Sequence, residues 1–260
     1  KYLLKNYPAF IWDSKEAKFN KIDKIISIPL HLLIAIDRQI KILKENTVNF
    51  GNNNFTNNAL LWGARGNGKS TLIKSIFNEL ISDFPDLRLI QLNKNNIIEI
   101  KQIYSILNKF IDYRFIVFID DLSFEKNDDD YKIIKSILDG SLLNQPNNII
   151  LYVTSNHRHL MSRDMIDNER SSAIITDESV EEKISLSDRF GLSLGFYNCT
   201  QKEYYNIVKG YSKKYKLKIS ERELESQALK WSISRGSRSG RVAWQFIQDL
   251  AGKLEQKLIS

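Results

Sequence analysis

The residues best suited to phosphate chemistry form one continuous run, Gly63-Ala64-Arg65-Gly66-Asn67-Gly68-Lys69-Ser70. This run matches G-x-x-x-x-G-K-[ST], the pattern of a phosphate-binding loop or P-loop. Its glycines let the backbone turn sharply and point N–H groups at phosphate oxygens, at the positive end of the following helix. Lys69 is expected to reach the β- and γ-phosphates, and Ser70 to ligate Mg²⁺. The residues expected to bind the nucleotide are Gly63, Ala64, Arg65, Gly66, Asn67, Gly68, Lys69, Ser70 and Thr71.

Two acidic residues end a second run, Phe115-Ile116-Val117-Phe118-Ile119-Asp120-Asp121. Ligands bind at the carboxyl edge of the strands in open α/β sheets, so this run places two carboxylates beside the phosphates. Asp120 suits the acid associated with Mg²⁺ in a Walker B element, and Asp121 can polarise the attacking water. Glu125 lies in the loop beyond and is a second candidate base, with Asp121 preferred. A strand-ending aspartate that merely starts a turn is the alternative explanation.

Three further polar residues have the chemistry to act on a transferring phosphoryl group. Asn156 follows a third apolar run and could hold a water between the two acids and the γ-phosphate. Arg189 and Arg241 each lie beside small or apolar residues, in the sequences SDRFG and GRVA. Arginine suits such a group because it stays charged and offers a planar fork of donors. Arginines are common here, however, since Arg235 and Arg238 lie nearby.

Apolar runs that alternate with helical segments must position these residues. The runs predicted as strands are Ala59–Trp62, Leu87–Leu92, Phe115–Ile119, Ile149–Thr154 and Leu192–Tyr197. The third run, and the fourth from Ile149 to Val153, are continuously apolar, which is typical of strands covered on both faces of a parallel sheet. The segments between them carry apolar stripes at three-four spacing. The pattern therefore predicts an α/β fold, an αβα sandwich around a parallel sheet.

Three helices and no strand are predicted after residue 198, over Gln201–Tyr215, Ser220–Ser234 and Gly240–Leu258. They indicate a small all-α domain attached to the sheet. At the other end of the chain, residues 1–28 mix aromatic and lysine side chains without the order of strand, loop and helix. We therefore expect an N-terminal extension at 1–28, a P-loop nucleotide-binding domain at 29–198 and a helical lid domain at 199–260.

The order of these motifs resembles that of the AAA+ ATPases, from about residue 29 to the end of the chain. Three segments, ALLWGARG at 59–66, DDLSFE at 120–125 and LSDRFGL at 186–192, look more closely like one bacterial and plastid AAA+ family. That family is catalogued mainly as a domain of unknown function. One departure concerns the end of Walker B, where many AAA+ proteins have Asp-Glu and this chain has Asp-Asp. Replication initiators and helicase loaders of the class are similar in having Asp-Asp.

The resemblance implies Mg²⁺-dependent hydrolysis of ATP to ADP and phosphate, coupled to motion of the lid and of an oligomer. It also implies that Asn156 is sensor 1, that Arg189 is an arginine finger acting in trans, and that Arg241 is sensor 2 reaching from the lid. A nucleotide-dependent homo-oligomer follows from the finger. The segment Leu33–Asp37 resembles the apolar element that receives adenine in AAA+ proteins, although a core helix explains it equally well.

The charge balance fits a polyanionic partner. The 260 residues carry 38 Lys and Arg against 31 Asp and Glu, a net charge of +7 and a pI near 9.2. A basic protein of this kind can bind nucleic acid. The chain is also rich in Lys, Ile and Asn, as AT-biased coding often produces, and that bias alone would raise the pI. The basic run from Lys209 to Lys218 is more typical of a solvated helix face than of a nucleic-acid patch.

Other classes of function are disfavoured by what the sequence lacks. The longest apolar stretch, Ile25–Ile36, is interrupted and too short for a membrane span. Cys199 is the one cysteine, so an internal disulfide is excluded, and it has no His pattern around it that would predict zinc. A reducing compartment is expected, bacterial-type cytoplasm or the interior of an organelle. The chain begins at Lys1, so a native N-terminus with its targeting peptide can lie outside it.

Two functions therefore stand side by side. The first is an ATPase of the AAA+ type that acts on an unidentified client. The alternative is a nucleotide-gated module that binds nucleic acid or a protein and hydrolyses little ATP, which the Asp-Asp pair and the positive charge favour. A small-molecule kinase is disfavoured, because it explains neither Arg189 nor a helical tail that carries Arg241.

Overall fold

Seven strands build one sheet in this computed structural model, which describes residues 2–124, 130–139, 146–158, 160 and 186–258. The strands are β1 (Ala9–Asp13), β2 (Lys18–Ile22), β3 (Ala59–Gly63), β4 (Leu87–Leu92), β5 (Arg114–Ile119), β6 (Ile149–Ser155) and β7 (Leu192–Phe196). Their order is β2-β1-β4-β5-β6-β3-β7, and every neighbouring pair is parallel except β1 with β2. The five strands predicted from apolar runs are confirmed, and so is the parallel sheet.

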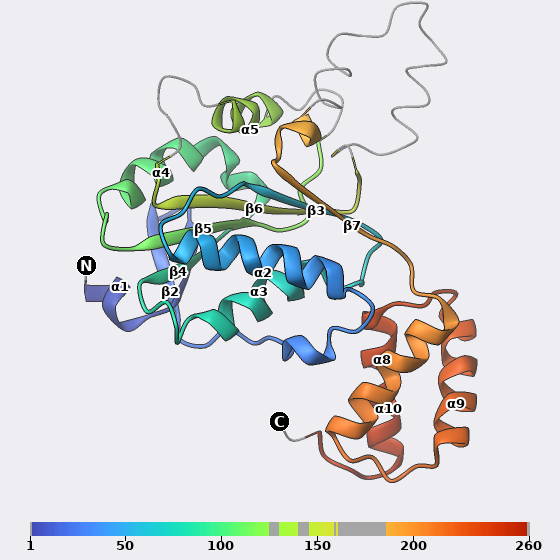
Figure 1. The fold of residues 1–260 in the computed structure, drawn as a ribbon. Coiled ribbons are helices and arrows are strands. Elements are labelled where there is room, and N and C mark those ends of the chain that lie inside the picture. Colours follow the sequence, from blue (N-terminus) through green and yellow to red (C-terminus); the bar gives the residue numbers. More distant parts are fainter. Residues whose placement is uncertain (1, 125–129, 140–145, 159, 161–185, 259–260) are drawn as a thin grey trace, which may run out of the picture.

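Helices cover both faces of this sheet, as Figure 1 shows. The helices in the described ranges are α1 (Tyr2–Asn6), α2 (Asp37–Gly51), α3 (Lys69–Leu80), α4 (Ile100–Asn108), α5 (Asp130–Leu138), α8 (Gln201–Lys214), α9 (Glu221–Ser234) and α10 (Gly240–Lys253). Helices α2 and α3 pack on one face of the sheet through one apolar cluster. Helices α4 and α5 pack on the other face through a second cluster. The αβα sandwich is therefore confirmed. Within these ranges, no helix combines the length and the apolar character that crossing a membrane requires.

The last three helices form a separate bundle beside the sheet (Figure 1). Apolar side chains of α8, α9 and α10 share a third cluster, which also takes in Leu32 from the short 3₁₀ helix η1 (Leu30–Leu32). Side-chain caps begin each helix: Thr200 with Glu203 forms a capping box, and Ser220 and Ser239 each accept a backbone N–H. Such caps satisfy N–H groups that the helix itself leaves unpaired. The all-α lid is therefore confirmed.

The N-terminal segment departs from expectation, because the sequence pattern predicts no strand before residue 59. Strand β1 pairs with β4 in the main sheet and buries Phe10 and Trp12, each 2% exposed. Strand β2 lies at the sheet edge with most of its side chains in solvent, so it lacks the apolar run of a buried strand. The division at residue 28 stays a prediction, but these two strands belong to the sheet.

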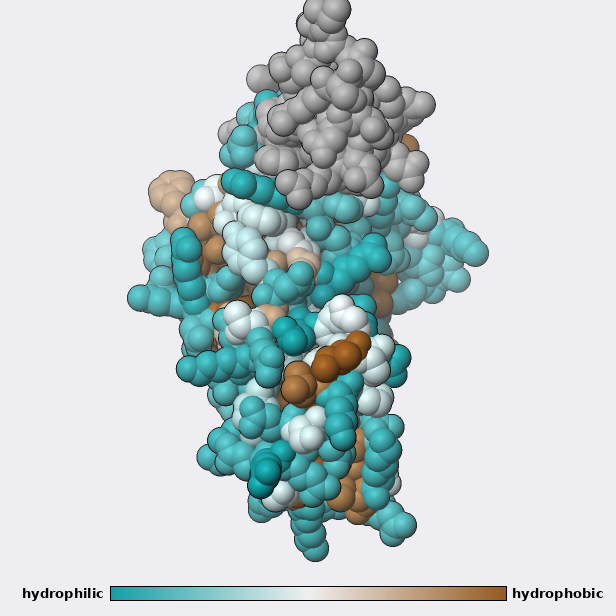
Figure 2. Space-filling view, turned by 90° about the vertical axis from the view of Figure 1, so that its right-hand side faces the viewer, coloured by the Kyte–Doolittle hydropathy of each residue, from teal (hydrophilic) through white to brown (hydrophobic). Residues whose placement is uncertain are grey.

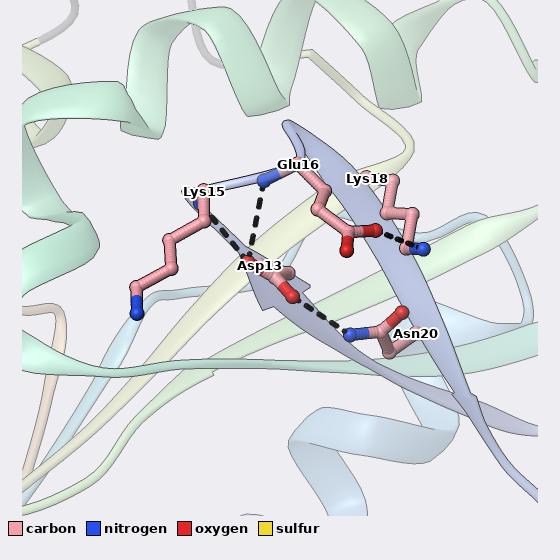
Figure 3. A network of polar contacts seen from close by, with 5 residues as sticks. All are labelled: Asp13, Lys15, Glu16, Lys18 and Asn20. Carbon is pink, nitrogen blue, oxygen red and sulfur yellow. Dashed lines mark hydrogen bonds and ion pairs between the residues drawn. The ribbon is translucent and has the colours of Figure 1, made fainter.

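Polar contacts of one aspartate close the turn between β1 and β2 (Figure 3). Asp13 accepts hydrogen bonds from the backbone N–H of Lys15 at 2.9 Å and of Glu16 at 3.4 Å. Its second oxygen accepts from the side chain of Asn20 at 3.2 Å, and Glu16 pairs with Lys18. Aspartate is common in turns for this reason, since it bonds the backbone two residues further on. The turn fixes the hairpin that extends the sheet.

Candidate nucleotide-binding site

The predicted phosphate loop leaves strand β3 at Gly63 and enters helix α3 at Lys69. Gly63 has φ of +126°, and a Cβ built there would lie 2.0 Å from the carbonyl oxygen of Phe196 in β7. Ala64 donates its N–H to the same oxygen at 2.9 Å. The side chain of Asn67 donates to the carbonyl of Tyr197 at 2.9 Å. Strand β7 therefore holds the loop in place, and glycine is required at its first position.

Lys69 is buried at the end of the loop, where α3 begins, with 7% of its surface exposed. Its Nζ donates to the carbonyls of Gly63 at 2.7 Å and Ala64 at 2.9 Å, and to Oδ1 of Asn156 at 3.2 Å. Burial lowers the pKa of Lys69 to about 8, against the opposing effect of Asp121 and Asp120. The ammonium is thus held on oxygen acceptors and has lost much of its hydration, so phosphate oxygens can replace those acceptors.

Asp120, which directly follows strand β5, is hydrogen-bonded to the phosphate loop. Its Oδ1 accepts hydrogen bonds from Ser70 Oγ at 2.5 Å and from Thr154 Oγ1 at 2.6 Å. A hydroxyl and a carboxylate are hard oxygen donors, which Mg²⁺ prefers, and Mg²⁺ is usually held by one or two carboxylates together with substrate phosphates and water. Ser70 and Asp120 therefore fit the metal role that the sequence predicts for them. In the described part of the chain, no three or more His, Cys, Asp and Glu residues lie together as a group that could hold a metal ion.

Asp121 and Asn156 form a second pair beside the lysine. The Nδ2 of Asn156 donates to Oδ1 of Asp121, while its Oδ1 accepts from Lys69. Asp121 has a left-handed backbone with φ of +53°, and its N–H donates to Thr154 Oγ1 at 2.9 Å. A non-glycine residue with this φ is uncommon, and Thr154 helps to hold it. The structure thus links Lys69, Asn156 and Asp121, whereas Glu125 lies outside the described residues.

A cavity of about 710 Å³ opens above these groups, within the range of small-molecule sites. Its polar floor contains Asp120, Asp121, Thr154, Asn156 and the loop from Arg65 to Thr71. Leu33, Ile34, Ala35 and Ile36 form an apolar wall. These residues precede α2, which begins at Asp37, so the alternative of a core helix over this segment is wrong.

The lid lines part of the cavity and touches the phosphate loop directly. The backbone N–H of Arg241 donates to the carbonyl of Gly66 at 3.0 Å. A Cβ added to Gly66 would lie 3.0 Å from Arg241 Cβ and from Ser239 Oγ, so the two segments approach too closely for a side chain there. Arg241 itself lines the cavity with an exposed side chain. Arg241 therefore lies beside the phosphate loop, and its role as a sensor stays a prediction.

Arg189 lies apart from this cavity. It ends the 3₁₀ helix η3 (Ser187–Arg189), and its Nε forms an ion pair with Asp139 at 2.5 Å, just beyond α5. It is not among the residues that line the cavity. The structure brings the other predicted site residues together, apart from Glu125, but it places Arg189 elsewhere on the same subunit.

Sequence reasoning missed three residues of this site. Thr154 supports both acids, and its one sequence signal is its place at the end of a buried strand. Tyr211 and Trp244 line the cavity from the lid with their ring centroids 5.2 Å apart. Both lie on the periodic apolar faces of α8 and α10, where the sequence pattern indicates core positions.

Comparison with known protein families gives one match, over residues 5–254, to DUF815, described as a protein of unknown function. The chain belongs to the DUF815 family. No curated protein matches this DUF815 chain significantly.

Solved structures show what fold the DUF815 chain adopts. It resembles the R170A variant of RuvB from Thermotoga maritima with a TM-score of 0.56 at 18% identity, over 88% of this chain and 66% of that one. ORC2 of Aeropyrum pernix gives 0.62 at 12% identity, over 92% and 68%. ORC1 of Aeropyrum pernix, in complex with DNA, gives 0.57 at 14%, over 85% and 61%.

The chain therefore spans about two thirds of the length of the structures it matches. At such identities the likeness establishes the fold, which is that of the AAA+ ATPases. The predicted P-loop sandwich with its lid, and the resemblance to an AAA+ family of unknown function, are both confirmed.

Proposed function

We propose that this protein binds ATP with Mg²⁺ and hydrolyses it to ADP and phosphate, and that turnover moves the lid against the sheet domain. One observation carries the proposal. Lys69, Asn156 and Asp121 form a hydrogen-bonded chain on the floor of a cavity whose opposite wall is apolar. A cation that can neutralise phosphate charge, together with an amide and a carboxylate that can position a water, suits phosphoryl transfer to water.

Binding uses the two chemically different halves of the cavity. The N–H groups of the phosphate loop and the Lys69 ammonium face the phosphates, and the apolar wall from Leu33 to Ile36 suits a flat base. Ser70 and Asp120 would hold Mg²⁺, which supplies charge neutralisation at the phosphate oxygens. The solved ORC2 structure contains ADPNP and ADP, a precedent for nucleotides on this fold.

Hydrolysis then depends on Asp121 and Asn156. When phosphate oxygens replace Asn156 as the partner of Lys69, the amide of Asn156 is released to orient a water. Asp121 accepts a hydrogen bond from that water and takes its proton as the oxygen attacks the γ-phosphorus in line. The bond from the γ-phosphorus to the β–γ bridging oxygen then breaks, and ADP leaves. Arg241, reaching from the lid, stabilises charge on the phosphates, so lid position and chemistry are coupled.

The proposal includes an oligomer that completes the site. Arg189 lies outside its own subunit's cavity and is bound to Asp139. An arginine in such a position can serve a neighbouring subunit, as the arginine finger does when it acts in trans. We therefore propose a homo-oligomer that forms with nucleotide and acts on a nucleic-acid or protein client.

Replacing Asp121 by Asn should reduce ATP turnover by about 10²–10⁴-fold, the usual contribution of a positioned general base. ATP affinity should change little, because the amide keeps the shape of the side chain. Phosphate release and fluorescent-nucleotide binding measure the two effects separately. Glu125→Gln is the matched comparison, and it should keep turnover within about threefold. If Glu125→Gln loses turnover while Asp121→Asn keeps it, the catalytic base is Glu125.

ATP affinity should fall as the pH rises above 8. In the free protein the pKa of Lys69 is about 8, so the ammonium is progressively lost above that pH. Phosphates favour the ammonium and raise the pKa of Lys69, so binding takes up a proton at a pH between the free and bound pKa values. Calorimetric titrations in buffers of different ionisation heat measure this uptake. Lys69→Arg stays charged and should show none. Equal uptake by both proteins would contradict the assignment.

A further inference from the structure

The net positive charge of this protein lies in its lid. Residues 201–260 contain thirteen Lys and Arg against six Asp and Glu, and residues 1–200 contain twenty-five of each. The whole excess of seven charges therefore lies in the last sixty residues. A coding bias toward lysine would spread along the chain, so it does not account for this distribution. The lid therefore has a net charge of +7, whereas residues 1–200 have none.

Within the lid, one segment is basic without any acidic residue. Residues 226–248 contain Lys230, Arg235, Arg238 and Arg241 and no Asp or Glu. They form the second half of α9, a turn and the first half of α10, so the charges gather at one end of the bundle. Arg241 faces the nucleotide cavity, but Arg235 and Arg238 do not line it. We call residues 234–238 the arginine turn.

The arginine turn is exposed at Arg235 and half-buried at Arg238, and neither side chain has an acidic partner among the described residues. In the described ranges, no carboxylate forms an ion pair with Arg235 or Arg238, whereas Lys209 and Lys253 of the same bundle pair with Glu221 and Asp249. Arg235 is exposed and lies over the ring of Trp231, at 4.7 Å from its centroid. The indole holds the guanidinium in one place, which lowers the entropy lost when it binds.

The other groups of the arginine turn can donate hydrogen bonds to phosphodiester oxygens. Gly236, at the tip, has φ of +63° and no atom within 4 Å of where a Cβ would lie, so a bulky ligand can approach the backbone. The N–H groups of Ser237 and Arg238 donate to no acceptor in the described part of the chain. Arginine forks, hydroxyls and backbone N–H groups are the donors that proteins use on nucleic-acid phosphates.

The arginine turn is joined to the nucleotide site by a short path. Ser239 and Arg241, which follow it directly, are the residues that contact Gly66 of the phosphate loop. A ligand on the turn and a nucleotide in the cavity therefore act on the same stretch of backbone. A ligand on the turn that shifts this backbone should change the affinity for ATP, and by linkage ATP should change the affinity of the turn by the same factor. Figure 2 shows that the lid, in the lower part of that view, has a mainly hydrophilic surface.

We propose that the arginine turn binds the phosphate backbone of a nucleic acid, which is the client of the ATPase. A polymer fits better than a small anion, because the turn is open and the excess charge extends over the lid. The statement that the nucleic acid is the client rests on the proposed ATPase function. The statement that the arginine turn binds nucleic acid is tested without it. Binding is measured without nucleotide, so a failure of ATP hydrolysis and a failure of nucleic-acid binding are told apart.

The test is fluorescence anisotropy of labelled 20-nucleotide single strands and 20-base-pair duplexes with the full chain, at 50–200 mM salt. The variant is Arg235→Gln/Arg238→Gln. Lys213→Gln/Lys216→Gln is the control, because it removes the same charge from exposed positions at the other end of the bundle. Circular dichroism and ATP binding check the fold, and Arg238→Gln alone spares the contact with Trp231.

The wild type should bind at least one probe with an affinity that falls steeply with salt, by about 0.7–0.9 in log–log slope for each phosphate contacted. The arginine variant should bind about 10-fold or more weakly with a slope reduced by about 1–2, and the control should stay within threefold. Arg238→Gln should lie between them. Equal losses in both double variants, or no binding by the wild type at 50 mM salt, would overturn the proposal. So would an arginine variant that keeps probe affinity but loses self-association, which would make the turn a subunit contact.

Discussion

Replacing Lys69 by Ala should abolish ATP binding at concentrations where the wild type is saturated, a loss of about 10²-fold or more in affinity. Its ammonium is the one buried cation of the phosphate loop, held on three oxygen acceptors. A charge-assisted hydrogen bond in a partly dehydrated site is worth more than one in water, and the lysine would make several to the phosphates. Without it, the loop keeps its backbone N–H groups and the exposed Arg65 but has no buried cation to offer the phosphates.

Two further variants separate charge from folding. Lys69→Met keeps an unbranched side chain without the charge, and it should also lose binding. Lys74→Ala, on the same helix but outside the cavity, should bind ATP as the wild type does. Equilibrium binding of a fluorescent ATP analogue, with circular dichroism as the folding check, compares the three. Unchanged affinity in a folded Lys69→Ala protein would refute the phosphate-loop assignment.

Replacing Arg189 by Ala should lower ATP turnover by about 10³–10⁵-fold while leaving ATP affinity almost unchanged. That range is typical of an arginine finger supplied from another subunit. The contrast with Lys69 follows from the geometry, because Arg189 is bound to Asp139 and does not line its own cavity. Turnover per subunit in the wild type should accordingly rise with protein concentration.

Mixing two inactive variants tests whether the finger acts in trans. A Lys69→Ala subunit has no nucleotide site but keeps Arg189, and an Arg189→Ala subunit has the site but not the finger. Together they should recover part of the wild-type phosphate release, since some neighbouring pairs contain one intact site. Activity that is flat and high at the lowest wild-type concentration, or a mixture as inactive as its components, would contradict a finger in trans.

The sequence predicts the buried half of this molecule well because burial constrains residue type. Strands β5 and β6 are covered on both faces, so the runs Phe115–Ile119 and Ile149–Val153 within them are made of buried hydrophobic residues. The phosphate loop is equally constrained, since Gly63 leaves no room for a Cβ against Phe196. Such patterns can be recognised in the sequence without knowing which other segments pack against them.

The rest of the fold depends on partners that no local pattern specifies. Strand β2 is an edge strand whose side chains face mostly solvent, and α1 is too short to show a period. The role of Thr154 arises from hydrogen bonds to Asp120 and Asp121, which lie more than thirty residues away. The contact of the lid with Gly66 likewise joins segments far apart in the sequence. The arginine turn is visible in the sequence, but its proximity to the phosphate loop is not.

The most direct test of the central claim is phosphate release from ATP and Mg²⁺ by the wild-type protein, at a concentration where mass measurement in ATP shows an oligomer. We expect steady turnover that stops on chelation of Mg²⁺ and is absent in Lys69→Ala. Tight ATP binding without turnover in any oligomeric state, with or without polynucleotide, would contradict hydrolysis and identify the protein as a nucleotide-gated binding module.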